Sequence, residues 1–320
     1  MQGKKLMQNN NKIKQEKNIN IIVITDKKSG LPFSKGILAS SISVTGLDMI
    51  SSHKIAYEIE QYLLNSKVIS IPMEELRSLV FRFIKDEFNI EYAEKYLLWQ
   101  SVGKLKKPMI ILIGGATGVG KSTIATILAN RLNITRVASS DAIRKVMRAS
   151  VSEKLIRPLR GSSYNAYKNL TLPPSGVDPV ILGFREQVIA VSVGIGAIIK
   201  RNIEEKSDII IEGAHVVPGY LDLDKYESRA IILQIVISVP DKEIHKEHFT
   251  KRTTETQGSR PMQKYIKHLD KIHMIQKYIE SLAKDNGINI IENYNLDNTV
   301  NEILEVIFHR VKQEFTKIRS

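Results

Sequence analysis

Apolar residues in the last two thirds of the chain follow two alternating periods. Stretches with helical spacing, such as IATILANRL at 124–132, separate short apolar runs of strand length. The runs are MIILI (109–113), ITRVAS (134–139), DIIIEG (208–213), AIILQIVISV (230–239) and INIIE (288–292). Strands that alternate with helices are typical of a parallel sheet covered by helices on both faces. The pattern therefore predicts an α/β domain over residues 105–320.

The chain before the linker SVGKLKKP (101–108) follows a different pattern. One apolar run, INIIVI at 19–24, precedes a polar turn, and a series of helical segments follows. We expect a small, mainly helical domain over residues 19–104. Residues 1–18 are rich in Lys, Asn and Gln without any apolar period, which predicts a disordered tail.

The composition is that of a soluble globular protein, with 42% apolar and 25% charged residues among 320. The sequence contains no cysteine, so disulfides, thiolate metal sites and cysteine nucleophiles are excluded. The longest apolar run, 188–199, is too short to cross a bilayer, and the N-terminus lacks the apolar centre of a signal peptide. We expect a cytoplasmic protein without a membrane partner.

The net charge of +13 fits a nucleic acid, a small polyanionic substrate or a solvated lysine-rich surface. No zinc-ligand spacing, internal repeat or basic stripe with interleaved aromatic residues accompanies this charge. We favour the solvated surface and expect no nucleic-acid partner. The sequence leaves open whether the chain forms a homo-oligomer.

The stretch GGATGVGKST at 114–123 joins the first apolar run to a helical stretch and matches the phosphate-loop motif G-x-x-x-x-G-K-[ST]. Its glycines let backbone N–H groups point at a phosphate, and Lys121 can reach the outer phosphates. Ser122 supplies a hydroxyl that can ligate Mg²⁺. A turn that only joins strand to helix would not require these two residues. The motif predicts ATP or GTP binding by Gly115, Ala116, Thr117, Gly118, Val119, Gly120, Lys121, Ser122 and Thr123.

Residues downstream of the loop indicate what receives the phosphate. In SSDAIRKVMR, after the second apolar run, the spacing puts Asp141 and Arg144 on one helix face at the carboxyl edge of the sheet. Asp141 could orient or deprotonate an acceptor hydroxyl, and Arg144 could bind an anion. A helix-capping residue with a surface ion pair is the alternative interpretation.

A second acidic position ends the third apolar run, in DIIIEGAHVVPG. Glu212 stands at the strand tip, where P-loop enzymes place an acid that supports Mg²⁺. His215 either contacts substrate or makes a structural hydrogen bond. Which of Asp141 and Glu212 is the base, and which supports the metal, stays open.

Arginines form a third group. Arg252 and Arg260 flank the polar loop TTETQGS, which suggests a mobile lid that brings arginines to the transferring phosphoryl group, although a solvated basic helix pair has the same pattern. Several arginines near one acceptor indicate a small acceptor with more than one negative charge. The candidates for that role are Arg148, Arg157, Arg160 and Arg185.

With these motifs the chain resembles archaeal 2-phosphoglycerate kinases, which join an ATP-cone-like domain to a P-loop kinase domain. The resemblance rests on GGATGVGKST, SSDAIR, GFREQVIAVSVGIGAIIKR, IIIEGAHVVPG and SRP, and for the first domain on GLPFSKGILASSISVTG and EYAEKYLLWQ. It implies a P-loop NTPase-type sheet and Mg²⁺-dependent transfer of the γ-phosphate of ATP to the 3-hydroxyl of 2-phosphoglycerate. The product would be 2,3-bisphosphoglycerate, a precursor of cyclic 2,3-diphosphoglycerate.

Two other functions stay open at this point. A P-loop kinase with these motifs could act on a nucleic-acid end or a sugar nucleotide. A nucleotide-sensing regulator without activity is the other alternative, although the acidic and arginine residues argue for an acceptor site. Under the kinase hypothesis, catalysis depends on Lys121, Asp141, Arg252 and Arg260, and the acceptor contacts Asp141, Arg144, Arg148, Arg185 and His215.

Overall fold

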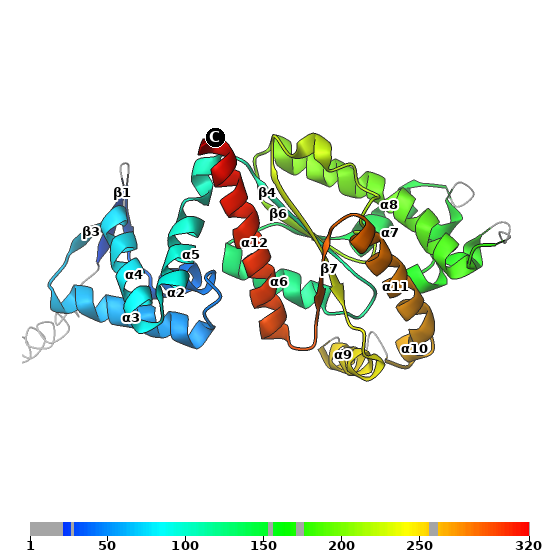
Figure 1. Cartoon of the computed structure of the whole chain (residues 1–320), viewed down its shortest axis with the longest axis horizontal. Helices are drawn as coiled ribbons and strands as arrows, with labels where there is room; N and C mark the ends of the chain where they lie inside the picture. The colour runs from blue at the N-terminus through cyan, green and yellow to red at the C-terminus, as the bar shows by residue number, and fades with distance from the viewer. Residues whose placement is uncertain (1–21, 27–28, 153–155, 171–175, 256–261, 320) are drawn as a thin grey trace, which may run out of the picture. The chain divides into compact units, whose positions relative to one another are not determined.

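The computed structural model describes residues 22–26, 29–152, 156–170, 176–255 and 262–319. Its internal contacts divide the chain into two compact units. The first unit comprises residues up to 42 and 47–94, and the second comprises residues 43–46 and 95–320. Each unit contains its own β-sheet (Figure 1).

The first unit combines a three-stranded sheet with helices. Strand β1 (Val23–Asp26) pairs antiparallel with β2 (Ser29–Pro32) and parallel with β3 (Ser70–Pro72). The helices of this unit are α2 (Lys35–Ser43), α3 (Met49–Asn65) and α4 (Met73–Glu87), and α5 (Ile90–Gln100) begins in this unit and continues into the second. Helices α3 and α4 pack together and have regularly spaced buried apolar residues, which form the core of this unit.

Five parallel strands form the sheet of the second unit, in the order β5-β6-β4-β7-β8. They are β4 (Met109–Gly114), β5 (Val137–Ser139), β6 (Ile209–Glu212), β7 (Ile231–Ser238) and β8 (Asn289–Glu292). Every residue of β4, β6 and β7 is buried, as expected for a parallel sheet covered on both faces. The predicted α/β fold is therefore confirmed.

Helices cover both faces of this sheet (Figure 1). They are α6 (Lys121–Leu132), α7 (Ser140–Ser150), α8 (Pro179–Glu204), α9 (Lys242–Glu255), α10 (Met262–Ile266), α11 (Leu269–Asp285) and α12 (Leu296–Arg319). Alternate residues of β4 face opposite sides. Ile111 and Ile113 pack in a core with α6, α11 and α12, whereas Ile110 and Leu112 pack in a core with α7 and α8.

Short 3₁₀ helices occupy several connections, namely η1 (Val102–Leu105), η2 (Arg157–Arg160), η3 (Ser163–Asn169) and η4 (Asp224–Tyr226). Helix α8 is long and apolar enough to cross a membrane, a property that core helices of globular proteins share. Its residues Phe184, Val191 and Ile195 are buried in the two cores beside the sheet. We therefore interpret α8 as a core helix.

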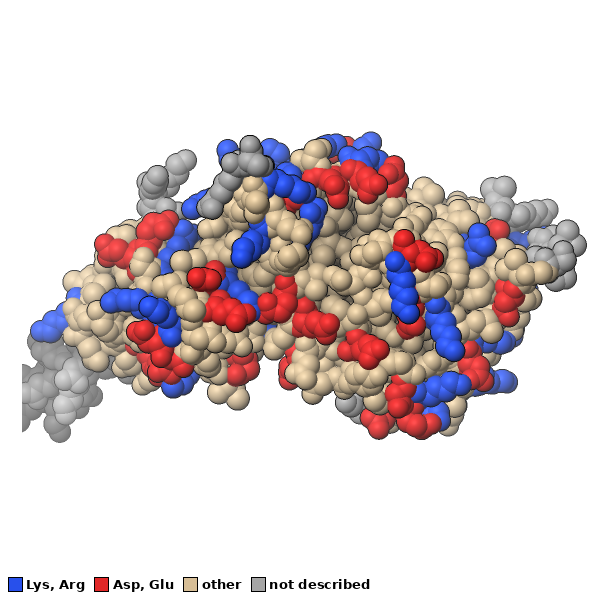
Figure 2. Space-filling view, viewed as in Figure 1, with Lys and Arg blue, Asp and Glu red and all other residues tan. Residues whose placement is uncertain are grey.

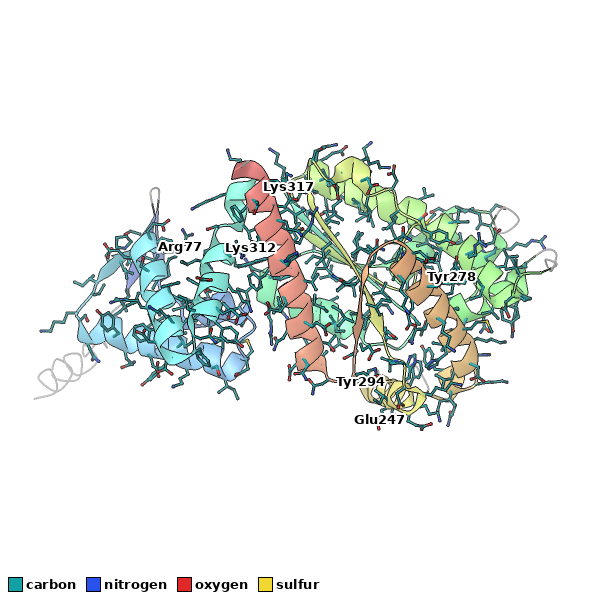
Figure 3. The ribbon with its side chains drawn as sticks, in the orientation of Figure 1. Arg77, Glu247, Tyr278, Tyr294, Lys312 and Lys317 are labelled. Atoms are coloured by element: carbon teal, nitrogen blue, oxygen red, sulfur yellow. The ribbon has the colours of Figure 1, made fainter. Side chains whose placement is uncertain are left out.

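The strand order fixes the place of the candidate site. From the central β4 the chain crosses to β5 and β6 on one side of the sheet and later to β7 and β8 on the other. Such a reversal of strand order opens a crevice at the carboxyl ends of the strands. The segments that follow all five strands converge at this edge, which the labelled residues Glu247 on α9 and Tyr294 after β8 mark in Figure 3.

Candidate active site

The phosphate loop, residues 115–120, connects β4 to α6. Gly115, Gly118 and Gly120 have φ angles of +132°, +92° and +91°, in the region that other residues rarely adopt. A Cβ atom at Gly115 would also lie 2.2 Å from the carbonyl oxygen of Ile237 on β7. Gly118 occupies a variable position of the motif, so this backbone requires one glycine more than the motif does.

The first turn of α6 provides the side chains that the motif predicts. Lys121 is buried, and its Nζ donates a hydrogen bond of 2.6 Å to the carbonyl oxygen of Ala116, so the amine lies over the loop. Ser122 and Thr123 are exposed in the same turn. The amine, the Ser122 hydroxyl and the positive end of the helix dipole are therefore grouped where they can bind one phosphate chain.

Side chains from three other segments hold the loop from outside. His245 on α9 donates from Nε2 to the carbonyl oxygen of Thr117 at 2.9 Å, and Asn293 after β8 donates from Nδ2 to the carbonyl oxygen of Val119 at 3.0 Å. The hydroxyl of Ser163 in η3 lies 3.2 Å from that of Thr117. Sequence reasoning missed all three side chains. Their only sequence signal is that two of them closely follow the apolar runs of β7 and β8.

The two candidate carboxylates lie at neighbouring strand ends but in different surroundings. Glu212 ends β6, opposite Ile113 of β4 and Ser139 of β5, and only 6% of its surface is exposed. Asp141 lies in the first turn of α7, and 62% of its side chain is exposed. Partial desolvation raises the pKa of Asp141, but the charges of Arg144 and Lys121 outweigh it and lower that pKa. Asp141 is therefore ionised at neutral pH.

His215 lies behind Asp141 in a buried chain of hydrogen bonds. The amide nitrogen of Gln187 on α8 donates to the carbonyl oxygens of Pro158 and Gly161, so its Oε1 accepts from His215 Nε2 at 2.8 Å. Nδ1 of His215 then accepts from the hydroxyl of Ser140 at 3.0 Å. Burial lowers the pKa of His215 to about 4, so the ring is neutral. Both ring nitrogens are used within the protein, which favours the structural interpretation of this histidine.

Arg144 is also buried, and it faces protein atoms. Its Nη1 donates to the carbonyl oxygens of Leu159 and Gly161 at 3.1 and 2.8 Å. Its Nε lies 3.5 Å from the carboxylate of Asp141. Arg144 and Gln187 thus share the carbonyl of Gly161, and together they fix the segment of η2 and η3 beside the catalytic edge. Asp141 and Arg144 lie on one face of α7 as predicted, but Arg144 also holds the segment of η2 and η3 in place.

The other arginines are less closely associated with this edge. Arg148 is exposed in the last turn of α7. Arg185 on α8 is exposed and hydrogen-bonded to Tyr220, whose hydroxyl lies 2.8 Å from that of Tyr278, the α11 residue labelled in Figure 3. That hydrogen bond is the main reason why the pKa of Arg185 is raised. Arg252 lies on α9, but its side chain, like the whole of Arg260, is outside the described residues.

The side chains at this edge suit a magnesium ion that is shared with phosphate oxygens. Within the described ranges no three His, Cys, Asp or Glu side chains form a self-contained metal site. Mg²⁺ binds through one or two protein oxygens together with water and substrate phosphates. The hydroxyl of Ser122 and the carboxylate of Glu212 are oxygen ligands of this kind. The edge can therefore position a nucleotide with its metal beside an ionised carboxylate.

Comparison with known proteins gives close relatives over nearly the whole chain, although no protein-family model matches it. The chain is 40% identical over 283 residues to the 2-phosphoglycerate kinase of Methanothermobacter thermautotrophicus, covering 88% of this chain and 92% of that one. It is 39% identical over 295 residues to the 2-phosphoglycerate kinase of Thermococcus kodakarensis, covering 92% and 99%. Among solved structures, a shikimate kinase from Bacteroides thetaiotaomicron is 15% identical with a TM-score of 0.34, over 62% of this chain and 98% of that one.

Proposed function

This chain belongs to the 2-phosphoglycerate kinase family, and we propose that it transfers the γ-phosphate of ATP to the 3-hydroxyl of 2-phosphoglycerate, giving ADP and 2,3-bisphosphoglycerate. One observation carries the proposal beyond family membership. An ionised carboxylate, Asp141, lies at the same sheet edge as the phosphate loop, beside a segment that two buried side chains hold in place. A nucleotide-sensing regulator has no use for such a second half of the site.

The nucleotide half uses the phosphate loop and the first turn of α6. The backbone N–H groups of the loop and the amine of Lys121 bind the β- and γ-phosphates. The amine now donates to the carbonyl of Ala116, and a rotation of the Lys121 side chain turns it towards a phosphate. Ser122 and Glu212 would hold a Mg²⁺ ion, which would supply positive charge to the transferring phosphoryl group. Glu212 suits this role because it is buried next to the loop.

The acceptor half uses the exposed carboxylate. An acceptor that enters from solvent can reach Asp141, whereas Glu212 is covered. Asp141 therefore orients the 3-hydroxyl and accepts its proton, with the guanidinium of Arg144 beside its carboxylate, Nε to oxygen 3.5 Å. Arg144 fixes the carbonyl groups of η2 and η3, and this segment forms a wall of the acceptor site. For direct contacts with the acceptor's phosphate and carboxylate, Arg148 keeps the role that the sequence predicts, although it lies in the last turn of α7 and Asp141 in the first.

Arg252 and Arg260 keep the role that the sequence predicts, contact with the transferring phosphoryl group. Arg185 is a weaker candidate for acceptor binding than the sequence suggested, because its guanidinium is already bonded to Tyr220. We assign residues 19–104 to an ATP-cone-like domain ahead of a kinase domain at 105–320, in a cytoplasmic enzyme. On the visible face basic side chains gather around the end of α12, and basic and acidic side chains alternate elsewhere (Figure 2).

The test is ADP release coupled to a reporter enzyme, with Mg²⁺–ATP and one of 2-phosphoglycerate, 3-phosphoglycerate, glycerate or no acceptor. We expect stimulation by 2-phosphoglycerate alone, and its loss in the Lys121→Ala variant. Equal rates in all four reactions would contradict the proposed acceptor. Stimulation by oligonucleotide ends, with a steep dependence on salt, would support the alternative kinase.

A further inference from the structure

Six residues form a closed ring, joined by hydrogen bonds, aromatic contacts and one peptide bond, that starts and ends at the tip of the phosphate loop. In order around this contact ring they are Thr117, His245, Phe249, Tyr265, Tyr164 and Ser163. The ring passes from the loop through α9 and α10 to η3 and back to the loop. It therefore joins the nucleotide half of the proposed site to the segment that forms the wall of the acceptor half.

The first part of the contact ring joins the loop to α9. His245 is fully buried and donates to the carbonyl oxygen of Thr117, while its Nδ1 lies 3.1 Å from Nε2 of His273 on α11. The ring of Phe249 stacks on His245 at 4.9 Å and packs directly against Gly118. A loop that shifts when it binds phosphate must therefore move both rings or lose both contacts.

The second part consists of aromatic rings. Phe249 stacks on Tyr265 with 4.8 Å between centroids and 5° between planes. Tyr265 meets Tyr164 edge to face at 6.3 Å, and Tyr164 also stacks on His268 at 5.1 Å. Such pairs contribute beyond the area they bury, because their quadrupoles favour these geometries. Tyr164 is buried in η3, next to Ser163, whose hydroxyl closes the ring on Thr117.

Thr117 holds both ends of the contact ring with different atoms, its carbonyl towards His245 and its hydroxyl towards Ser163. A change in the loop is therefore transmitted to η3 both directly and through the aromatic rings. The segment just before η3 is the one that Arg144 and Gln187 hold beside Asp141. The order of the acceptor wall thus depends on the conformation of the phosphate loop, and the conformation of the loop depends on the order of the wall.

We propose that this contact ring couples ATP binding to acceptor binding, with His245 and Phe249 as positioning residues that touch neither ligand. The inference rests on the proposed function and concerns how binding of the two substrates to that same site is regulated. Binding of ATP fixes the phosphate loop, and binding of the acceptor fixes the acceptor wall. Because the contact ring joins the two segments, the second ligand then binds a segment that is already ordered. Coupling of this kind must be reciprocal, so each ligand raises the affinity for the other by the same factor.

The experiment measures that factor by titration calorimetry. The affinity for β,γ-imido-ATP with Mg²⁺ is determined with and without saturating 2-phosphoglycerate, and the reverse titration checks reciprocity. We expect about a fivefold or greater coupling in the wild-type protein. In Phe249→Leu, which keeps an apolar side chain but removes the stacking, we expect both ligands to bind and the factor to fall close to one. Phe308→Leu is the matched control, because Phe308 is another buried ring, on α12, that packs on Trp99 outside the contact ring.

Two further variants keep the test decisive if Phe249→Leu does not fold. His245→Ala removes the donor to Thr117 and should lose the coupling, whereas His245→Gln supplies an amide donor and should recover part of it. An unchanged coupling factor in the folded variants, or no coupling in a wild-type protein that binds both ligands, would overturn this inference alone. A wild-type protein that binds no 2-phosphoglycerate would overturn the proposed function as well.

Discussion

Replacement of Gly118 by alanine tests whether the phosphate loop depends on its contact with α9. The added Cβ would lie 2.3 Å from Cε1 of Phe249 and 2.9 Å from Nε2 of His245, at a φ angle of +92°. A left-handed conformation costs a non-glycine residue about 1–2 kcal/mol. Overpacking of a buried contact costs about 1–3 kcal/mol. We therefore expect Gly118→Ala to lower the free energy of unfolding of the second unit by about 2–5 kcal/mol.

The single tryptophan of the chain is a fluorescence probe for the unfolding of the second unit. This residue, Trp99, belongs to the second unit and packs edge to face on Phe308 at 6.2 Å. Urea unfolding followed by tryptophan fluorescence therefore reports on this unit. Relief of the clash requires the loop to move away from Phe249 and His245 or these rings to move off the loop. Either change disturbs the phosphate loop, so the KM for ATP should rise together with the loss of stability. Coupled ADP release measures that KM.

Alanine substitutions at two other glycines separate the cost of the backbone conformation from the cost of the clash. Gly287 has a φ angle of +64° with open space around it, so Gly287→Ala should cost only the conformational part, about 1–2 kcal/mol. Gly196 lies inside α8, also with open space, and Gly196→Ala should be neutral or stabilising by up to about 1 kcal/mol. If Gly118→Ala were no less stable than Gly287→Ala and kept the wild-type KM for ATP, the packing argument would be wrong.

The remaining predictions use the same two assays. Lys121→Ala should lower turnover by orders of magnitude while the unfolding transition remains, and near-normal turnover would contradict the phosphate-loop assignment. Glu212→Gln should raise the Mg²⁺ concentration needed for half-maximal rate, with little change in the KM for the acceptor. Arg144→Ala should raise the KM for the acceptor far more than that for ATP and lower stability, because the carbonyl of Leu159 loses its donor and that of Gly161 keeps only the one from Gln187; an equal rise in both KM values would argue against its role in the acceptor wall. His215 and His245 have pKa values lowered to about 4, so between about pH 6.5 and 4 the unfolded chain takes up protons that the folded chain does not. Stability should therefore decrease as the pH falls through that window, by up to about 3 kcal/mol for each histidine, and the fluorescence-detected urea midpoint should decrease less steeply in His245→Gln.

The fold could be predicted because strand and helix periods alternate clearly after residue 108. The main difference concerns the run at 134–139, of which only Val137–Ser139 forms a strand. Asn133 ends α6 in a left-handed conformation, and the N–H of Ile134 returns to the carbonyl of Ala129 at 2.8 Å. Ile134 is therefore an apolar residue of a helix end. Periodicity alone does not distinguish such a residue from the first residue of a strand.

The residues proposed to bind ATP and Mg²⁺ could be predicted because Lys121 belongs to a motif with fixed spacing and Glu212 ends an apolar run of strand length. The residues that brace the site could not. His245 lies 128 positions from the Thr117 carbonyl that it holds, and Asn293 lies 174 positions from Val119. A buried carbonyl needs a donor, but no rule of spacing says which distant segment will supply it. The same reason explains why Arg144 was predicted as a ligand group and also proves to be a brace.

The lowered pKa of Asp141 is consistent with a kinase more than with other uses of a carboxylate at this place. A carboxylate held in its ionised form by Arg144 and Lys121 is a weak base. Enzymes that must remove a proton early in the reaction raise the pKa of the base towards neutrality instead. Phosphoryl transfer makes no such demand, because its loose transition state leaves catalysis mainly to positioning and electrostatics. An exposed Asp141 with a low pKa, set against a buried neutral His215, therefore suits a residue that orients a hydroxyl in line with the γ-phosphate and takes the proton late.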